Sequence, residues 1–352
     1  MVNALLWSVP LPAPEHVVSW FGAAQAQDYE PAKWALAIRT SGIGNSELDQ
    51  AVDEGRILRT HALRPTWHFV APEDIRWLQA LTGPRVHRLS AHYYRTLELD
   101  EKLRDLTERL ITRWIEDDGD LTRKEIGRRL GVEGIEAEGS RLAYVLMNAE
   151  LNGAVCSGRR QGTSHTYALV SQRAPNSTLM SEDAALAELT LRYFRSHGPA
   201  TIGDFRWWSS LTVAQIRRGL EALGDQIVHE KIADLDVWSH GSANVEPTRS
   251  LPTVHLLQPY DEYLGAFADT KTAIDTAGLG VSFPVFEGRA FYHAVIINGQ
   301  LAGWWRRTLG RRQIELEFRL LRRLSGAERE SLDGAAAAYG RFHDLPITLT
   351  VG

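Results

Sequence analysis

The six residues Leu121-Thr122-Arg123-Lys124-Glu125-Ile126 decide the fold, because they start a helix with a capping box. Thr122 stands at the N-cap position and Glu125 follows three residues later, so each side chain can accept from the other residue's backbone N–H. Gly131 is expected to end this helix. The stretch therefore marks the first helix of a helix-turn-helix unit.

The unit continues with a second helix and a hairpin. The helix is expected over residues 139–152, and strands at 155–157 and 166–170 flank a turn that carries Arg159 and Arg160. This order is typical of a winged helix, whose second helix fits a DNA groove and whose basic hairpin contacts phosphate. We therefore predict that both arginines bind DNA.

A third copy of the unit lies further along the chain. Thr201 and Asp204 repeat the capping pattern, another helix starts at Thr212, and residues 227–237 form a hairpin. Repeats of this kind fix an architecture, and three DNA-binding modules on one chain suggest a protein that wraps a duplex.

The first copy is more degenerate than the other two. A helix runs from Asn45 to about Gly55, and strands at 57–61 and 66–70 are joined through Pro65. The alternative interpretation is that the three copies are ordinary helical bundles with hairpins.

Length and composition indicate a multidomain chain. At 352 residues with 44% hydrophobic residues, two to four packed domains are expected. We predict an α+β protein with tandem winged helix-turn-helix domains followed by a C-terminal antiparallel β-barrel. The expected division is 1–100 for the N-terminal helices and first winged helix, 101–175 for the second, 176–250 for the third and 251–352 for the barrel.

The barrel prediction rests on a strand-like pattern after Pro252. Asn298-Gly299 tolerates the positive φ values of a type I′ turn, and residues 313–320 alternate as a strand with one buried face does. Strands are expected at 254–257, 291–297, 300–306 and 313–320, with a helix at 326–340.

Positive charge is concentrated in this C-terminal part. The chain has a formal charge of −5, but residues 304–323 hold seven arginines against two glutamates, a net +5, so the remainder carries −10. A turn at Gly310 carries Arg306, Arg307, Arg311 and Arg312, and an arginine-lined hairpin fits the negative minor groove of DNA. The alternative is a solvated edge hairpin that charge protects against aggregation.

Composition also excludes several kinds of site. The one cysteine, Cys156, excludes internal disulfides and a multi-cysteine zinc site, and we expect no metal and no cofactor. No apolar run reaches ~18 residues, so no membrane span is expected. The first five residues lack the basic start of a secretory signal, and we expect a cytoplasmic protein.

A candidate chemical site lies at residues 22–28, between expected helices at 14–21 and 31–39. Gln25 and Gln27 point the same way on extended backbone, whereas on a helix they diverge by about 200°. Such a pair also occurs by chance, and two solvated glutamines are the alternative.

The chain resembles the AlkZ/YcaQ group of winged-helix DNA glycosylases. The resemblance rests on residues 22–28, 63–74, 258–264 and 298–306, and the run RPTWHF at 64–69 is its most specific part. It implies three tandem winged helices and a C-terminal barrel around duplex DNA. It also implies excision of N7-alkylated purines, and in some members unhooking of interstrand crosslinks formed by alkylating natural products. Whether the role is general repair or self-resistance to a toxin stays open. The family's glutamine–apolar–glutamine motif falls on Gln25 and Gln27, the candidate catalytic residues.

The chemistry of such a reaction suits glutamine. A neutral amide cannot act as a general base near pH 7, but it can accept a hydrogen bond from a water and orient it. An N7-alkylated guanine is cationic and leaves as a neutral base, so no general acid is needed. Asp28 is a candidate for stabilising the positively charged sugar, or else caps the following helix.

Three other features are weighed beside the glutamines. His68 falls on the strand face opposite Trp67 and is a candidate supporting residue in contact with the site and DNA, or else structural. Trp67 is expected in the core. Asp261 and Glu262 resemble an acid pair without metal spacing and are interpreted as a barrel or interdomain contact.

Two functions follow from these patterns. The first is a monomeric, monofunctional DNA glycosylase that acts on double-stranded DNA with alkylated purines and holds its nucleophilic water with glutamine. The second is a non-enzymatic winged-helix transcription regulator, but regulators usually dimerise and no sustained apolar heptad is evident.

Overall fold

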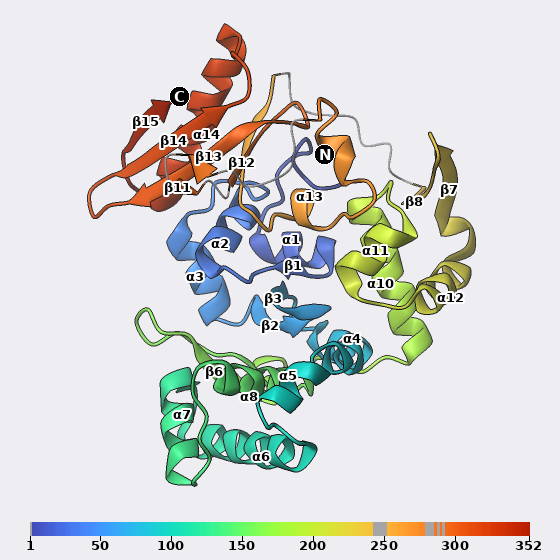
Figure 1. The fold of residues 1–352 in the computed structure, drawn as a ribbon, viewed down its shortest axis with the longest axis vertical. Helices are drawn as coiled ribbons and strands as arrows, with labels where there is room; N and C mark the ends of the chain where they lie inside the picture. Colours follow the sequence, from blue (N-terminus) through green and yellow to red (C-terminus); the bar gives the residue numbers. More distant parts are fainter. Residues whose placement is uncertain (1, 242–251, 279–284, 287–288, 291–292) are drawn as a thin grey trace.

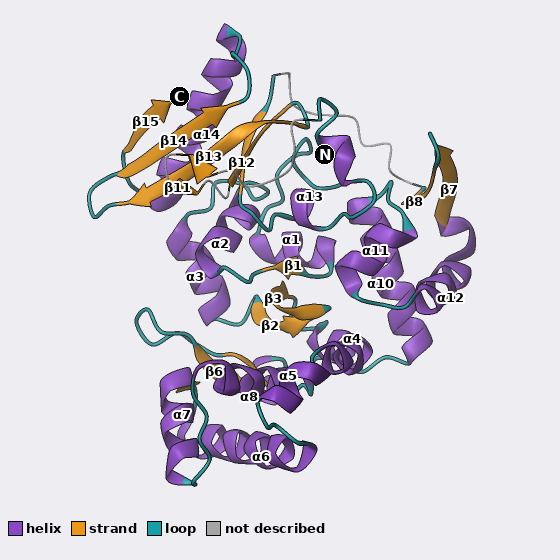
Figure 2. Cartoon of the chain, in the orientation of Figure 1, coloured by secondary structure: helices purple, strands orange, loops and turns teal. Residues whose placement is uncertain are grey.

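The computed structural model describes residues 2–241, 252–278, 285–286, 289–290 and 293–352. Helices predominate and surround several small sheets, which is a mixed α+β arrangement (Figure 1, Figure 2). Within the described residues, no helix combines the length and apolar character that crossing a membrane requires.

The second repeat has the predicted order of elements. They are α6 (Glu101–Asp118), β4 (Leu121–Thr122), α7 (Arg123–Val132), α8 (Gly139–Leu151), β5 (Val155–Ser157), β6 (Thr166–Leu169) and α9 (Val170–Arg173). The capping box of Thr122 and Glu125 is confirmed, since Glu125 N donates to the threonine hydroxyl and Thr122 N to the carboxylate. The predicted break at Gly131 is wrong, because α7 continues to Val132 and the chain turns at Gly134, where φ is +76°.

The third repeat also follows the prediction. Its elements are α10 (Glu182–His197), α11 (Ile202–Ser209), α12 (Val213–Leu223), η1 (Gly224–Gln226), β7 (Ile227–Ile232) and β8 (Leu235–His240). Thr201 and Asp204 form the predicted capping box, and Thr212 caps α12 together with Gln215. Both helices therefore start where the local sequence places them.

The first repeat contains the glutamine segment. Its elements are α1 (Pro14–Phe21), β1 (Ala24–Gln25), α2 (Tyr29–Ala37), α3 (Asn45–Asp53), β2 (Leu58–Ala62), β3 (Arg64–Val70), α4 (Ile75–Leu89) and α5 (Ala91–Thr96). The strands form a sheet in the order β1-β3-β2. Pro65 lies inside β3, so the predicted junction there is wrong; the chain turns at Leu63, whose φ is +60°.

The C-terminal part is an open sheet rather than a closed antiparallel barrel. Five strands pair in the order β15-β14-β13-β12-β9, and among the described residues the edge strands β9 and β15 do not meet. β14 and β15 pair in parallel, because α14 connects them as a crossover. The elements are β9 (Val254–Leu257), α13 (Glu262–Gly265), η2 (Lys271–Ile274), β10 (Val285–Phe286), β11 (Arg289–Ala290), β12 (His293–Ile297), β13 (Gln300–Leu309), β14 (Ile314–Leu320), α14 (Gly326–His343) and β15 (Ile347–Val351). Phe291 and Tyr292, at the start of one predicted strand, lie outside the described residues.

Hydrophobic cores join segments that are distant in sequence. One core packs α1, α2 and α3 against the C-terminal sheet and α14, with Trp34 in contact with Tyr339 and Phe342. A second core packs β2, β3 and α4 against α10, α11 and α12. The glutamine strand β1 therefore lies between the two, close to the middle of the molecule (Figure 1).

Candidate functional site

The glutamine segment is an extended edge of the β1-β3-β2 sheet. Gly22, with φ +81°, ends α1 and donates its N–H to Val18 O, which turns the chain into β1. In β1 Gln25 stands opposite His68, and Ala26 N donates to Trp67 O. β1 ends at Gln25 and the chain bends at Gln27, so the common face of the two glutamines stays a prediction.

The side chain of Gln25 has an unused acceptor. Only 9% of the residue is exposed, and Gln25 Oε1 is buried without a hydrogen-bond partner among the described residues. It lines a cavity of ≈ 10 Å³ together with Arg39, Gln258 and Glu262, about the space that one water needs. Gln258 Nε2 is likewise buried without a partner in the described structure. The buried Oε1 of Gln25 thus keeps its capacity to accept a hydrogen bond.

Gln27 is exposed and partly engaged. Its Oε1 accepts from Trp67 N at 3.2 Å, which leaves its amide N–H groups toward solvent. Arg59 holds the backbone of the same segment, donating to Ala26 O at 2.9 Å and to Gln27 O at 3.2 Å. The guanidinium of Arg59 stacks on Trp67, 4.5 Å from the ring centroid. Arg59 therefore holds the backbone at Ala26 and Gln27 against β3.

His68 lies on the same sheet face as Gln25, because residues directly opposite each other in an antiparallel pair share a face. The residue is fully buried, and its Nδ1 lies 3.0 Å from Thr66 O. Burial and the neighbouring Arg64 cation lower the pKa of His68 to about 3, so the ring is neutral at pH 7. His68 is therefore a buried, uncharged side chain next to Gln25.

Asp28 lies at the N-cap of α2 and is exposed, but its side chain forms no capping hydrogen bond. Its carboxylate thus faces solvent beside the glutamines. The structure brings Gln25, Gln27, Asp28 and His68 together on adjoining backbone.

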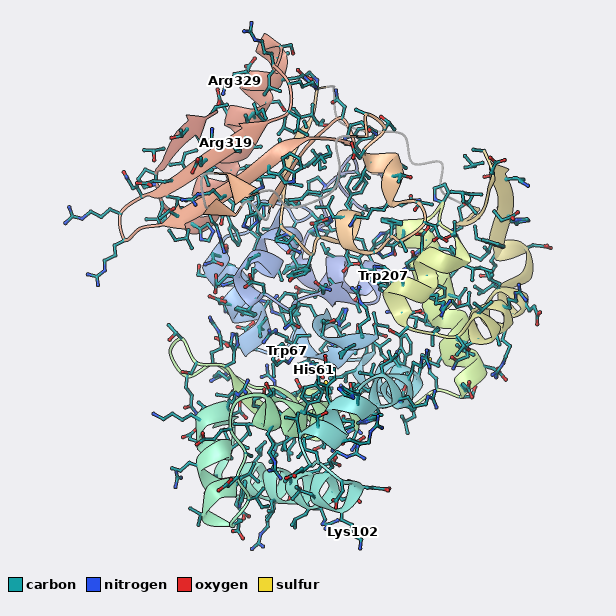
Figure 3. The ribbon with its side chains drawn as sticks, in the orientation of Figure 1. His61, Trp67, Lys102, Trp207, Arg319 and Arg329 are labelled. Carbon is teal, nitrogen blue, oxygen red and sulfur yellow. The ribbon has the colours of Figure 1, made fainter. Side chains whose placement is uncertain are left out.

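Two buried carboxylates anchor the site strands: Glu150, for which no role was predicted, and Glu262, which was interpreted as part of a barrel or interdomain contact. Glu150 of α8 is 1% exposed, pairs with His61 Nδ1 and accepts from Trp67 Nε1 at 3.2 Å. Figure 3 shows His61 and Trp67 side by side at this junction. Glu262 is 5% exposed and accepts from Gln25 N at 2.8 Å. One carboxylate thus holds β3, and the other holds β1.

Asp261, next to Glu262, forms a bidentate ion pair with Arg39. Arg39 donates to Asp261 Oδ2 at 2.8 Å and to Oδ1 at 2.7 Å, and both side chains are fully buried. The pair ties α2 to the start of α13, across 222 positions of sequence.

The predicted DNA-binding arginines fall into two groups. Arg160 pairs with Asp49 at 2.9 Å and Asp53 at 3.0 Å, which docks the β5–β6 turn on α3. Arg306 pairs with Glu317, and Arg307 donates to the Tyr339 hydroxyl. The exposed ones are Arg159, whose backbone N–H donates to Asp120, together with Arg311 and Arg312 at the β13–β14 turn. The β5–β6 and β13–β14 turns both lie at the left edge of Figure 1, below and above α3.

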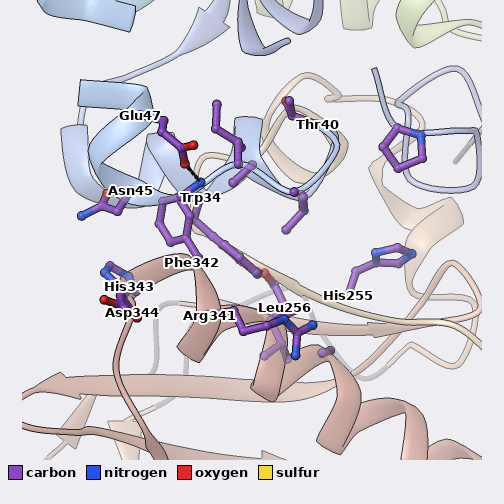
Figure 4. Close-up of a pocket in the computed structure, with 18 of the residues that line it drawn as sticks. Trp34, Thr40, Asn45, Glu47, His255, Leu256, Arg341, Phe342, His343 and Asp344 are labelled. Atoms are coloured by element: carbon purple, nitrogen blue, oxygen red, sulfur yellow. Dashed lines mark hydrogen bonds between the residues drawn. The ribbon is translucent and has the colours of Figure 1, made fainter. Parts of the chain in front are cut away.

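A larger cavity, of ≈ 1270 Å³, lies on the other side of α2. It is bounded by α3, β9 and α14, and Figure 4 shows residues that line it. Glu47, Asp49 and Asp344 face it against Arg341, and it shares no lining residue with the Gln25 cavity.

Comparisons with known proteins agree on one family. The family model described as "DNA glycosylase AlkZ-like" matches residues 18–342. A relative from Streptomyces sahachiroi, named an interstrand DNA cross-link repair glycosylase, is 26% identical over 273 residues, 72% of this chain and 71% of that protein. The solved structure of Streptomyces sahachiroi DNA glycosylase AlkZ superposes with a TM-score of 0.76 at 20% identity and covers 99% of this chain and 97% of that chain. The last likeness shows the fold.

Proposed function

This chain belongs to the AlkZ-like DNA glycosylase family, and on that basis we propose that it hydrolyses the N-glycosidic bond of N7-alkylated purines in duplex DNA. Gln25 and Gln27 hold the attacking water. Family membership sets aside the alternative of a non-enzymatic regulator. Because the Streptomyces relative is named for crosslink repair, the proposal extends to unhooking crosslinks formed through purine N7. We propose that the protein acts as a monomer in the cytoplasm.

One observation supports the proposal: the carboxamide oxygen of Gln25 is buried and has no hydrogen-bond partner among the described residues. A water held there needs only to be oriented, because the alkylated base already carries the positive charge that makes it a good leaving group. His68 is neutral and does not supply a proton at pH 7. Asp28 lies close enough along the chain to favour a cationic sugar electrostatically. The site therefore selects for bases that leave without acid catalysis.

The proposed DNA surface uses the three helix-turn-helix units as winged helices. We retain the division at 1–100, 101–175, 176–250 and 251–352 as a proposal, with the last part an open sheet. The turns that carry Arg159 and Arg311 project from the same edge of the molecule (Figure 1), which supports a concave surface for a duplex. Arg160, Arg306 and Arg307 shape the same two hairpins through their internal contacts, and we propose that they approach the backbone of DNA.

Charge reversal at Arg311 and Arg312 should weaken duplex binding at all sequences alike. Each lost phosphate contact should flatten the plot of log affinity against log salt by about one unit. Binding is measured by fluorescence anisotropy at several salt concentrations. Reversal of Arg109 and Arg113, two exposed arginines of α6, changes net charge equally and is the control. An unchanged slope in the hairpin variant would remove this hairpin from the DNA surface.

A single gel assay tests the function. The full chain is incubated with a duplex that contains one N7-methylguanine, and the DNA is then treated with alkali. We expect strand scission at the modified position and none in the unmodified duplex, because alkali cleaves at abasic sites. Scission no greater than in an enzyme-free sample would reject the proposed activity.

A further inference from the structure

Glu262 is a buried carboxylate that joins three parts of the chain. It begins α13, and its Oε1 accepts from Gln25 N at 2.8 Å. Its Oε2 accepts from Trp208 Nε1 at 2.9 Å and lies 3.1 Å from His197 Nε2. Burying a carboxylate costs several kcal/mol unless hydrogen bonds replace its hydration, and three donors do so here. These three hydrogen bonds therefore hold the Glu262 carboxylate in one orientation.

The charge of Glu262 persists in this setting. Burial raises the pKa of its carboxyl, but the hydrogen bond and charge of His197 and the hydrogen bond from Gln25 N outweigh burial and hold the pKa below its usual 4.5. Arg64 adds a nearby positive charge. The group is therefore an anion at pH 7, able to accept from all of its donors at once.

The hydrogen bond from Gln25 N to Glu262 satisfies a backbone N–H on the side of β1 that has no neighbouring strand. β1 has two residues and is the edge of its sheet. Ala26 N donates to β3, so the N–H of the preceding residue, Gln25, points away from the sheet. Glu262 occupies the place of a missing neighbour strand on that side. The backbone of Gln25 is thus held from both sides, and the residue lines the small cavity.

We propose that Glu262 is a positioning residue for excision: its carboxylate fixes the backbone of Gln25 and thereby aims the Gln25 carboxamide at the reacting water. The inference rests on the proposed function. It also links the site to the third repeat, since His197 ends α10 and Trp208 belongs to α11. Docking of that repeat and orientation of Gln25 then depend on one carboxylate.

The test uses the full-length variant Glu262→Gln. The amide lacks the negative charge and has one acceptor oxygen instead of two, so the hydrogen bond from Gln25 N is lost or weakened whichever way the amide turns. We expect single-turnover excision to slow by about 10- to 100-fold, as for a misplaced reacting group, with DNA affinity unchanged. In a Gln25→Ala background the same change should add almost nothing, because both act through one side chain.

Asp204→Asn is the matched control. Asp204 is fully buried, accepts from the backbone N–H groups of Ala268 and Asp269, and forms no hydrogen bond with β1 within the described residues. It should lower thermal stability and leave excision, measured well below the melting temperature, at the parental rate. Parental excision by Glu262→Gln, or an equal slowing with and without Gln25, would overturn the inference.

Amide hydrogen exchange separates this inference from the proposed activity. Exchange at Gln25 should accelerate in Glu262→Gln and stay parental in Asp204→Asn, whether or not the protein excises alkylated base. Parental exchange at Gln25 in Glu262→Gln would refute the inference alone, and failure of the alkali assay would refute the function alone. If Glu262→Gln does not fold, Glu262→Asp, one methylene shorter, must show the same acceleration and the same slower excision.

Discussion

Replacing Gln25 or Gln27 by alanine should slow excision of N7-methylguanine by about 10²-fold or more, because each change removes a hydrogen bond that orients the water. Duplex affinity should stay nearly parental, since neither glutamine belongs to the charged hairpins. The rate is measured under single-turnover conditions, and affinity by anisotropy with an undamaged duplex.

Two further variants sharpen this prediction. The double alanine variant should cost little beyond the worse single one, because the glutamines act on one water as a unit. Gln27→Glu should preserve part of the activity, since a carboxylate also accepts from water. Gln50→Ala removes an exposed glutamine of α3 that bonds only to Glu54 in the described structure, and it should excise at the parental rate.

Parental excision by both single alanine variants would show that the site lies elsewhere. The alternative of two solvated glutamines predicts that result. It fits poorly with Gln25, because that side chain is 9% exposed and its oxygen is buried. Gln27 alone has the exposure that the alternative requires.

Local chemistry explains why much of the fold was predictable. A capping box joins residues three positions apart, so Thr122 with Glu125 and Thr201 with Asp204 locate helix starts without knowledge of the rest. The Asn298-Gly299 turn is equally local, and both residues have positive φ values. Helix ends were less well placed, as at Gly131, because glycine is tolerated within a last turn.

Long-range pairing was beyond the sequence pattern. Period-two alternation shows that β14 buries one face, but not that β15 lies parallel to it or that the sheet stays open. The contact of Glu262 with Gln25 spans 237 positions, and no local rule specifies it. Sequence reasoning therefore proposed the glutamines and interpreted Glu262 as a barrel or interdomain contact, but did not predict its hydrogen bond to Gln25.

One missed residue left a readable signal. Glu150 follows Leu146 and Met147 on the buried face of α8, where a charge is unexpected without a partner. A lone acid on an apolar helix face predicts a buried partner, and here the partners are His61 and Trp67 Nε1. The same reasoning does not apply to Glu262, because α13 is too short to define a buried helix face.

Asp261→Ala should lower the free energy of unfolding by about 3–5 kcal/mol, the largest stability effect that we predict. The change leaves Arg39 fully buried without its carboxylate, and among the described residues the carbonyls of Ala4 and Ala35 are the acceptors that remain. Unfolding is followed in urea by circular dichroism. Because the pair ties α2 to the start of α13, the loss should also release the glutamine strand and slow excision.

The control is an ion pair of the same types at the surface. Arg218 and Asp183 are 46% and 76% exposed, so Asp183→Ala should cost less than about 1 kcal/mol. Asp261→Ala combined with Arg39→Met should recover part of the loss, because no unpaired charge then stays buried. If Asp261→Ala costs no more than Asp183→Ala, or the second change recovers nothing, the uncompensated Arg39 charge is not the cause. A recovery in stability without a recovery in excision would instead mean that the ion pair orients β1 as well as stabilising the fold.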